Sequence, residues 1–274
     1  MSMLEEVYIA GMPHLSYQGL SENWLLKECG HRHWLALAEL NNQSLPDFHD
    51  VSGNKAYAAF TAVKITSKSL NKIEENQSFS MRSEVTRVGA ARYYGEHSVL
   101  SRSFNAAQIS MLSTFVYRRE HGNNQSITRA NFVNEPKEFN GDREELNDWI
   151  TFAKAARSNN WVEHLGIQRY YSGEKKSITF NPSPYSDFNG AYFLYFANFQ
   201  NFIDKAEWEW FARDSLWALD QRELYFYGNI NVGDPLIVTL GSVLESKNEL
   251  KHWCEVFNQH NVKIADVFTN KRKA

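Results

Sequence analysis

The sequence predicts an α+β protein in which one fold unit, a long helix followed by an antiparallel meander of strands, occurs twice. The first observation is an internal likeness between MPHLSYQGLSENWLL at 12–26 and SPYSDFNGAYFLYF at 183–196. When Pro13 is placed opposite Pro184, a glycine also falls opposite a glycine. The second observation is that the same order of helical and strand patterns follows each stretch.

In the first half, the helical pattern covers 20–40. Ser21 is placed to cap this helix, apolar residues recur at helical spacing, and Gly30 is a point of interruption. Alternating patterns typical of strands follow at 55–65, 77–88, 91–102 and 109–120. This half is therefore predicted as one long helix followed by an antiparallel meander.

The second half repeats this order. An apolar segment with turn-spaced aromatic residues at 191–216 predicts a helix directly after Gly190, and strand patterns follow at 222–232, 233–246, 250–261 and 262–272. The intervening stretch is polar and rich in asparagine, with a modest helical pattern at 148–158. We therefore assign an N-terminal domain to 1–135, a linker to 136–160 and a C-terminal domain to 161–274.

The composition limits the classes of function. The 274 residues are 43% hydrophobic, enough for one large core or two smaller ones, and the net charge of −3 gives no sign of a nucleic-acid partner. Two cysteines, Cys29 and Cys254, are too few for a disulfide scaffold, and the sequence shows neither a signal peptide nor a membrane-spanning apolar run. A cytoplasmic protein without a membrane partner is predicted.

A helix followed by a meander, repeated once, is typical of the double hotdog fold, in which each antiparallel sheet wraps one long central helix. The stretch NVGDPLIVTLGSV at 231–243 resembles the Gly-Asp turn and alternating strand that hotdog domains commonly carry. A hotdog site polarises a thioester carbonyl at a helix N-terminus, where N–H groups and the helix dipole favour negative charge. Gly19 and Leu20 are predicted at the first helix start and Gly190 at the second, where glycine lets a substrate approach the backbone.

The second copy, D-F-N-G followed by an aromatic helix, resembles the Asp-x-x-Gly helix start of acyl-CoA thioesterases of the 4-hydroxybenzoyl-CoA type. This resemblance implies that Asp187 is a nucleophile or general base and that Asn189 and Gly190 contact the substrate. The spacing to the helix is longer here than in that family. A turn or capping role is the alternative for Asp187.

The first copy resembles a narrower family. GMPHLSYQGLSENWLLKECGHRHW at 11–34 and NKAYAAFTAVKI at 54–65 are similar to the acyltransferase/decarboxylase of leinamycin biosynthesis and its polyketide-cluster relatives, which are double-hotdog proteins. That family decarboxylates methylmalonyl-CoA and loads the product onto an acyl carrier protein, and its key tyrosine corresponds to Tyr57. The resemblance implies that Tyr57 either carries the acyl group or orients the enolate. Packing within a strand is the alternative.

Further candidates surround these motifs. His14 and Asn23 are candidates for stabilising the oxyanion, with a turn role as the alternative for His14, and Ser16 is a candidate substrate contact. Decarboxylation also requires a poorly solvated wall beside the leaving carboxylate. Candidates for this wall are Trp24, Trp34 and Phe60.

Three arginines on the first-half strands, Arg82, Arg87 and Arg92, are candidates for binding CoA phosphates or an acidic carrier protein. Solvated strand edges carry such charges anyway, which is the alternative.

His31 and His33 are two residues apart and do not share a helix face, so no zinc pair and no metal site are expected. The expected chemistry needs no cofactor beyond the CoA or phosphopantetheine of the substrates.

Three functions stay open. The preferred one is acyl transfer with decarboxylation of (methyl)malonyl-CoA onto an acyl carrier protein. The others are an acyl-CoA or acyl-carrier-protein thioesterase or dehydratase-like enzyme, and a non-catalytic acyl-binding partner. Most aromatic residues of the second helix are expected in a core or an interface. Three tryptophans that are expected to be exposed, Trp208, Trp210 and Trp253, predict a homodimer.

Overall fold

The computed structural model describes residues 2–67, 69–89, 91–131, 143–170, 175–211 and 217–273. The chain divides into two compact units. The first unit comprises Met1–Arg119 with Ile127–Gly141, and the second comprises Glu120–Ser126 with Asp142–Ala274.

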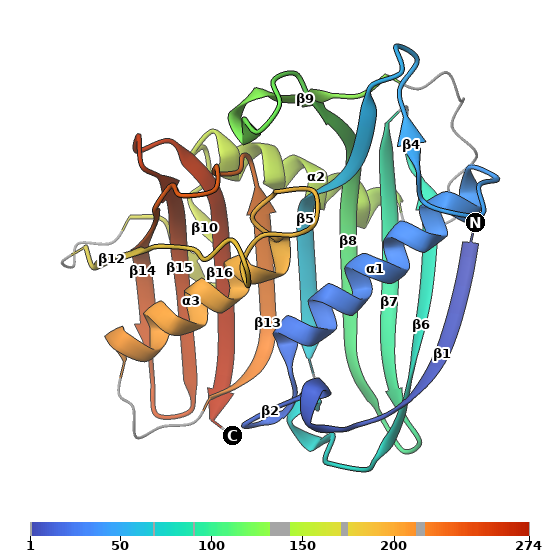
Figure 1. Cartoon of the computed structure of the whole chain (residues 1–274). Coiled ribbons are helices and arrows are strands. Elements are labelled where there is room, and N and C mark those ends of the chain that lie inside the picture. The colour runs from blue at the N-terminus through green and yellow to red at the C-terminus, as the bar shows by residue number, and fades with distance from the viewer. Residues whose placement is uncertain are drawn as a thin grey trace. The chain divides into compact units, whose positions relative to one another are not determined.

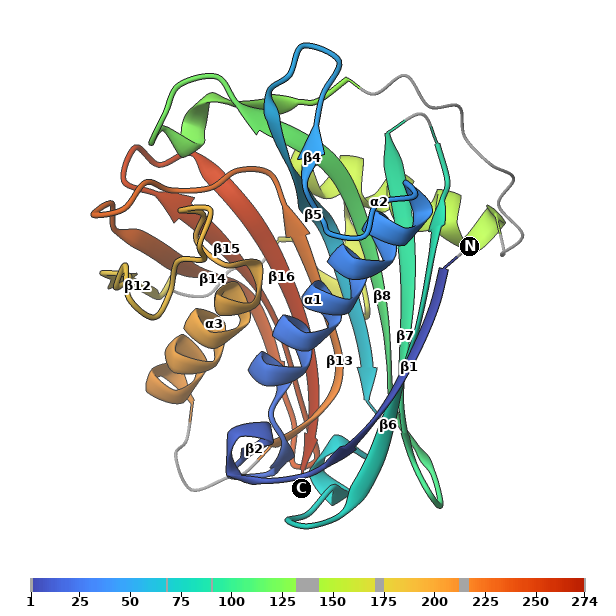
Figure 2. The same cartoon turned by 45° about the vertical axis from the view of Figure 1, so that its right-hand side comes forward.

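The first unit is an antiparallel sheet with one long helix on one face (Figures 1 and 2). Its main strands run in the order β1-β6-β7-β8-β5, and helix α1 packs against β6 and β1. Two short strands extend the sheet, with β4 paired to β5 and β9 paired to β8. The elements are β1 (Ser2–Ile9), η1 (Met12–His14), β2 (Leu15–Ser16), β3 (Gly19–Leu20), α1 (Glu22–Leu40), β4 (Phe48–His49), β5 (Lys55–Ser67), η2 (Leu70–Lys72), β6 (Ser78–Arg87), β7 (Arg92–Ser101), β8 (Asn105–Arg118) and β9 (Ile127–Arg129).

The second unit repeats this arrangement and adds a helix. Its main strands run in the order β13-β16-β15-β14-β12, helix α3 packs against β14, and helix α2 packs against β13 and β16. The elements are η3 (Asn124–Ser126), α2 (Arg143–Arg157), β10 (Glu163–His164), β11 (Ile167–Gln168), β12 (Ser177–Phe180), α3 (Phe196–Trp210), β13 (Trp217–Phe226), β14 (Leu236–Glu245), β15 (Glu249–Asn258) and β16 (Lys263–Lys273).

The two helices of the second unit cover opposite faces of its sheet. Arg222 on β13 points to α3, where its guanidinium contacts Asp204. Side chains alternate along a strand, so Tyr225 points the other way and packs against Phe152 of α2, with 5.4 Å between ring centroids. Figure 1 shows α3 in front of this sheet and α2 behind it.

The core of the first unit forms where the C-terminal half of α1 meets the sheet. Leu37 packs there with Phe48, Ala56, Phe115 and other buried residues. Ring contacts reinforce this packing, because Phe48 and Phe115 lie 4.7 Å apart by ring centroid. The apolar helical spacing in 20–40 and the alternation in 55–65 and 109–120 are therefore two sides of one core.

The predicted fold is confirmed. Each unit is a long helix against an antiparallel meander, so the chain is a double hotdog. The cap at Ser21 is also present, since its Oγ accepts a hydrogen bond from the backbone N–H of Trp24 at 3.3 Å. Among the described helices, none is long and apolar enough to cross a bilayer.

The predicted start of the second helix is wrong. Helix α3 begins at Phe196 rather than directly after Gly190. The side chain of Asn189 accepts hydrogen bonds from the N–H groups of Ala191 and Phe193, and Tyr192 has a φ of 63°, so a turn occupies these positions. The predicted helical residues 212–216 lie outside the described residues.

Two strands of the main sheets, β1 and β12, were not predicted, although β1 pairs along its whole length with β6 and β12 pairs with β14. Helix α2 falls within the predicted linker 136–160, yet it belongs to the second unit, where its residue Phe152 packs against Tyr225 and Phe268 of the sheet.

Candidate functional site

The chain enters helix α1 through a tight hairpin formed by β2 and β3. Gly19 has a φ of 70°, and a Cβ at this position would lie 2.3 Å from the carbonyl oxygen of Leu70. The lack of a side chain therefore serves contact with the protein's own backbone. Gly19 and the buried Leu20 precede the cap Ser21, so neither supplies an N–H group of the first helical turn, which was their predicted role.

His14 lies in the turn before this hairpin. Its Nδ1 accepts a hydrogen bond from the backbone N–H of Gly11 at 3.0 Å, and its ring packs edge-on against Trp24 at 4.7 Å between centroids. Ser16 is exposed, and its hydroxyl donates to the Gly19 carbonyl at 3.3 Å. The side chains of His14 and Ser16 thus stabilise the turn and hairpin ahead of α1. The half-buried Asn23 lies in the first turn of α1 itself.

Tyr57 lies near the beginning of β5, opposite Val116 of β8. Its neighbours Ala56 and Ala58 pack into the core against α1, so the alternation of side chains places Tyr57 on the other face of the sheet. Arg118 lies two residues beyond Val116, diagonally across from Tyr57 on that face, and the two side chains interact electrostatically. Burial lowers the pKa of the Arg118 guanidinium, and Tyr57 opposes this shift.

Within the first unit, the predicted site residues do not come together. Gly19 packs against Leu70, which follows the far end of β5, and Tyr57 is ten residues of strand from that end. At about 3.3 Å per residue, the strand separates them by roughly 30 Å. The apolar candidates have separate partners as well. Phe60 packs on the ring of His33, with 5.2 Å between ring centroids, and Trp34 packs on Phe48, with 4.9 Å between ring centroids. Both contacts lie on the α1 side of the sheet, whereas Tyr57 lies on the other face.

The three candidate arginines do not form one patch. Arg82 and Arg92 are exposed, and Arg82 pairs with Glu84 at 3.0 Å. Arg87 is buried on the opposite face of β6, where its Nε donates to the carbonyl of Gly89 and its guanidinium lies 5.8 Å from the ring centroid of Tyr93. Arg87 therefore has a structural environment.

Asp187 is held in a turn before α3. Its Oδ2 accepts the backbone N–H of Ser183 at 2.7 Å, and its backbone carbonyl accepts the N–H of Tyr195 and the side-chain amide of Asn198. The side chain is 9% exposed. These contacts match the turn role that the sequence analysis left open for Asp187. Gly190 is exposed in the same turn, and a Cβ at this position would have no atom within 4 Å.

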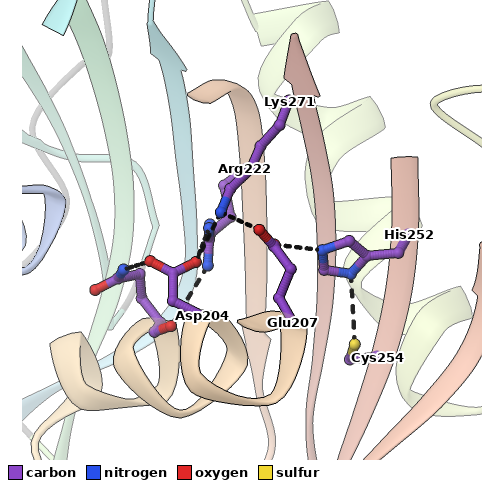
Figure 3. A network of polar contacts seen from close by, with 7 residues as sticks. Asp204, Glu207, Arg222, His252, Cys254 and Lys271 are labelled. Atoms are coloured by element: carbon purple, nitrogen blue, oxygen red, sulfur yellow. Dashed lines mark hydrogen bonds and ion pairs between the residues drawn. The ribbon is translucent and has the colours of Figure 1, made fainter. Parts of the chain in front are cut away.

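A network of charged side chains, most of them buried, joins α3 to the sheet of the second unit (Figure 3). Asp204 accepts hydrogen bonds from Arg222 at 2.7 Å and from Lys271 at 3.0 Å. Glu207 accepts from Lys271 at 2.6 Å and contacts His252 at 2.8 Å. Two carboxylates of α3 thus face two cations of the sheet, and the Asp204 side chain is partly exposed.

The pKa values follow from these contacts. Burial acts to raise the pKa of Glu207, but Lys271 and His252 outweigh burial and hold it below its usual value. Burial acts in the opposite sense on Lys271, whose pKa the two carboxylates nevertheless raise. Burial lowers the pKa of His252, with Glu207 opposing, so the ring is neutral near pH 7.

Three members of this group lie in the order of a nucleophilic triad. Cys254 Sγ is 3.4 Å from His252 Nδ1, and His252 Nε2 is 2.8 Å from Glu207 Oε2. However, the cysteine and the histidine are fully buried, and burial raises the pKa of the Cys254 thiol. A thiol in this environment is inert, so the geometry describes a structural contact.

This network was not predicted because its residues are scattered over one helix and three strands. The available signal was a charged residue at inward positions of otherwise apolar strands, as at Arg222 and Lys271. His31 is exposed and His33 is buried, so these two side chains lie on different faces of α1. The expectation that Trp253 is exposed was wrong: it is buried, and its indole N–H donates to Asp266 at 2.9 Å.

The tryptophans of α3 differ from Trp253. Trp208 is 50% exposed and Trp210 is half-buried. One of the three side chains on which the expected homodimer rested is therefore part of the core. The homodimer stays a prediction that rests on α3.

Known structures resemble this chain in fold rather than in sequence. No family model matches the chain, and no curated protein matches it in sequence. A structure described as an oleoyl thioesterase from Lactobacillus plantarum superposes with a TM-score of 0.66 at 9% identity, covering 99% of this chain and 96% of that one. A 12:0-ACP thioesterase from Umbellularia californica gives 0.65 at 6% identity, with 99% and 98% covered.

A third structure, an acyl-ACP thioesterase from Bacteroides thetaiotaomicron, gives a TM-score of 0.61 at 11% identity, with 98% of this chain and 97% of that one covered. The coverage of both chains means that the likeness includes both units. The chain therefore has the same fold as these thioesterases over nearly its whole length.

Proposed function

We propose that this protein is an enzyme that acts on acyl thioesters of coenzyme A or of an acyl carrier protein. The observation that carries the proposal is the likeness of fold, over nearly the whole chain, to structures described as acyl-ACP and oleoyl thioesterases. Those descriptions favour hydrolysis of the thioester as the reaction. The proposal involves no cofactor beyond the CoA or phosphopantetheine of the substrate.

Hydrolysis requires a base for the attacking water and donors for the negative charge on the thioester oxygen. Asp187 is the candidate base. The backbone N–H of Ser183 donates to Oδ2 of Asp187 and fixes the carboxylate in the turn before α3. Fixing a base removes the entropy cost of placing it at each turnover. The turn role and a catalytic role for Asp187 are therefore compatible.

Acyl transfer with decarboxylation is the second candidate, favoured by the position of Arg118 diagonally across from Tyr57 on one face of the sheet. A phenol is a weak nucleophile unless a hydrogen bond or a positive field activates it. Arg118 supplies a positive field beside Tyr57. The same guanidinium is also suited to bind the carboxylate of a malonyl-type substrate.

Mass spectrometry separates the candidates. The protein is incubated with a carrier protein and with malonyl-, methylmalonyl-, acetyl- or long-chain acyl-CoA. Free acid indicates hydrolysis, and a loaded carrier that has lost carbon dioxide indicates decarboxylating transfer. If every thioester persists unchanged, the proposal is wrong and a non-catalytic acyl-binding role takes its place.

Two variants assign the reaction to a residue. Tyr57→Phe keeps the ring and removes the hydroxyl, so stability changes by about 1 kcal/mol, while turnover falls on the order of 100-fold if the hydroxyl acts in the transition state. Asp187→Asn tests the base in the same way. Tyr94→Phe, on the same face of the first sheet, is the matched control and keeps full turnover.

A further inference from the structure

Two imidazole rings lie between α1 and the sheet of the first unit. His33 on α1 and His97 on β7 are fully buried, with ring centroids 6.0 Å apart. His33 Nε2 lies 2.8 Å from Ser113 Oγ, and His97 Nδ1 lies 2.8 Å from Ser83 Oγ. The other nitrogen of each ring, His33 Nδ1 and His97 Nε2, has no hydrogen-bond partner among the described residues.

These two nitrogens both lie close to Gly95 on β7. A Cβ built on Gly95 would lie 2.5 Å from His33 Nδ1 and 3.2 Å from His97 Nε2. Any side chain at this position would therefore displace the rings. Glycine leaves both nitrogens close to one point and close to each other. A buried polar atom without a partner costs about 1–3 kcal/mol, so two of them at one point require an explanation.

The contacts of Ser83 indicate which ring nitrogen of His97 carries the proton. Arg32 Nε donates to Ser83 Oγ at 2.8 Å, so the serine oxygen already accepts a hydrogen bond. The hydroxyl has one proton, and His97 Nδ1 is the acceptor within reach. With the hydroxyl proton in this bond, His97 Nδ1 is unprotonated and the proton of the neutral ring sits on Nε2, close to Gly95.

We propose that one water molecule binds above Gly95, accepting a hydrogen bond from His97 Nε2–H and donating one to His33 Nδ1. A buried water needs two to four polar partners in a polar site, and this site offers one donor and one acceptor. Bound there, the water joins the His33–Ser113 pair and the His97–Ser83–Arg32 chain into one connected network.

A metal ion fits this site less well, for two reasons. His97 Nε2 must lose its proton before it can bind a metal. In addition, the guanidinium of Arg32, which is bonded to the same Ser83, repels a second cation, and a charge in a buried site is costly unless an anion pairs with it. A neutral ligand avoids both costs.

The second unit supports this interpretation by contrast. Glu207 follows the cap of α3 by the same number of residues as His33 follows the cap of α1. Its carboxylate reaches His252 of the sheet directly, at 2.8 Å. In the first unit His33 occupies the corresponding helix position, and the water bridges the gap between its ring and His97.

The test is a high-resolution crystal structure combined with ¹⁵N,¹H NMR of histidine-labelled full-length protein. We expect one density peak at hydrogen-bond distance, about 2.7–3.2 Å, from both nitrogens, and a one-bond proton coupling on His97 Nε2. A proton on His97 Nδ1, a direct bond between the two rings, or density at about 2.0–2.1 Å with an anomalous metal signal would overturn the proposal.

Two variants extend the test. In Ser83→Ala the donor to His97 Nδ1 is lost, so we expect both tautomers of His97 to become populated, whereas an unchanged tautomer would contradict the argument from Ser83. In Gly95→Ala the added methyl displaces the water and the His33 ring, and the water cross-peak of His97 disappears. If Gly95→Ala does not fold, the measurements on the wild-type protein decide the proposal alone.

Discussion

Acidification is expected to destabilise this protein well above the pH at which carboxylates titrate. Three histidines are fully buried: His33, His97 and His252. Burial lowers the pKa of His33 to about 3, and it also lowers the pKa values of His97 and His252. All three are therefore neutral in the folded protein near pH 7, whereas in the unfolded chain they titrate near pH 6.5.

The direction of this pH effect follows from the linkage between protonation and folding. When the folded-state pKa lies below the unfolded-state pKa, stability is fully present above the unfolded value and is lost as the pH falls, because only the unfolded chain takes up the proton. As the pH falls from about 7.5 to about 5.5, each such histidine lowers the free energy of unfolding by about 1.4 kcal/mol. Three histidines together lower it by about 4 kcal/mol, which is an upper value because Glu207 partly restores the pKa of His252.

Such a loss is a large part of the 5–15 kcal/mol that stabilises most domains. Urea unfolding followed by tryptophan fluorescence at both pH values measures it. His33→Gln should remove about 1.4 kcal/mol of the pH-dependent loss, since glutamine does not titrate. His31→Gln, at an exposed position on the same helix, is the control and should leave the loss unchanged. A total loss below about 1 kcal/mol, or equal effects of the two variants, would refute the reasoning.

Three further results are expected. Gly19→Ala should destabilise the protein by about 2–4 kcal/mol in urea unfolding, because Gly19 has a positive φ and a Cβ there would clash with the backbone. The control Gly190→Ala should change stability by less than about 0.5 kcal/mol. Equal costs of the two variants would contradict this explanation. Glu207→Gln should cost about 3 kcal/mol by the same assay, because it leaves buried cations underpaired, and a neutral effect would show that the network relaxes. The thiols of Cys29 and Cys254, whose pKa values burial raises, should react with a thiol reagent only after unfolding, and rapid labelling of the native protein would show that they are accessible.

The elements of both units could be predicted from the sequence wherever one physical pattern dominated. Apolar residues at helical spacing after Ser21 placed α1, and alternation placed β5 to β8, because one face of each element is buried against one core. The pattern failed at 191–195, where a polar side chain, Asn189, bonds the backbone and delays the helix although the residues are aromatic. It also missed β1, whose partner β6 lies far away in the sequence.

The chemistry of single residues depended on tertiary structure. Motif resemblance selected Tyr57 and Asp187, and the need to stabilise an oxyanion selected His14. Only the folded chain shows that His14 and Asp187 are hydrogen-bonded into turns and that Arg118 lies diagonally across from Tyr57. Spacing along the chain carries no information about such neighbours, because each contact joins separate elements or a turn of specific geometry.

The sequence by itself determined that one unit is repeated, with a helix before a meander in each copy, because hydrophobic periodicity is a local property that each segment shows alone. Tertiary structure decided what lies between helix and sheet. Glu207 and His33 occupy matching helix positions, yet one meets Lys271 and His252 and the other meets Ser113. Burial changes the pKa of each group according to the partners that the fold brings to it, and those partners come from strands far away in the chain.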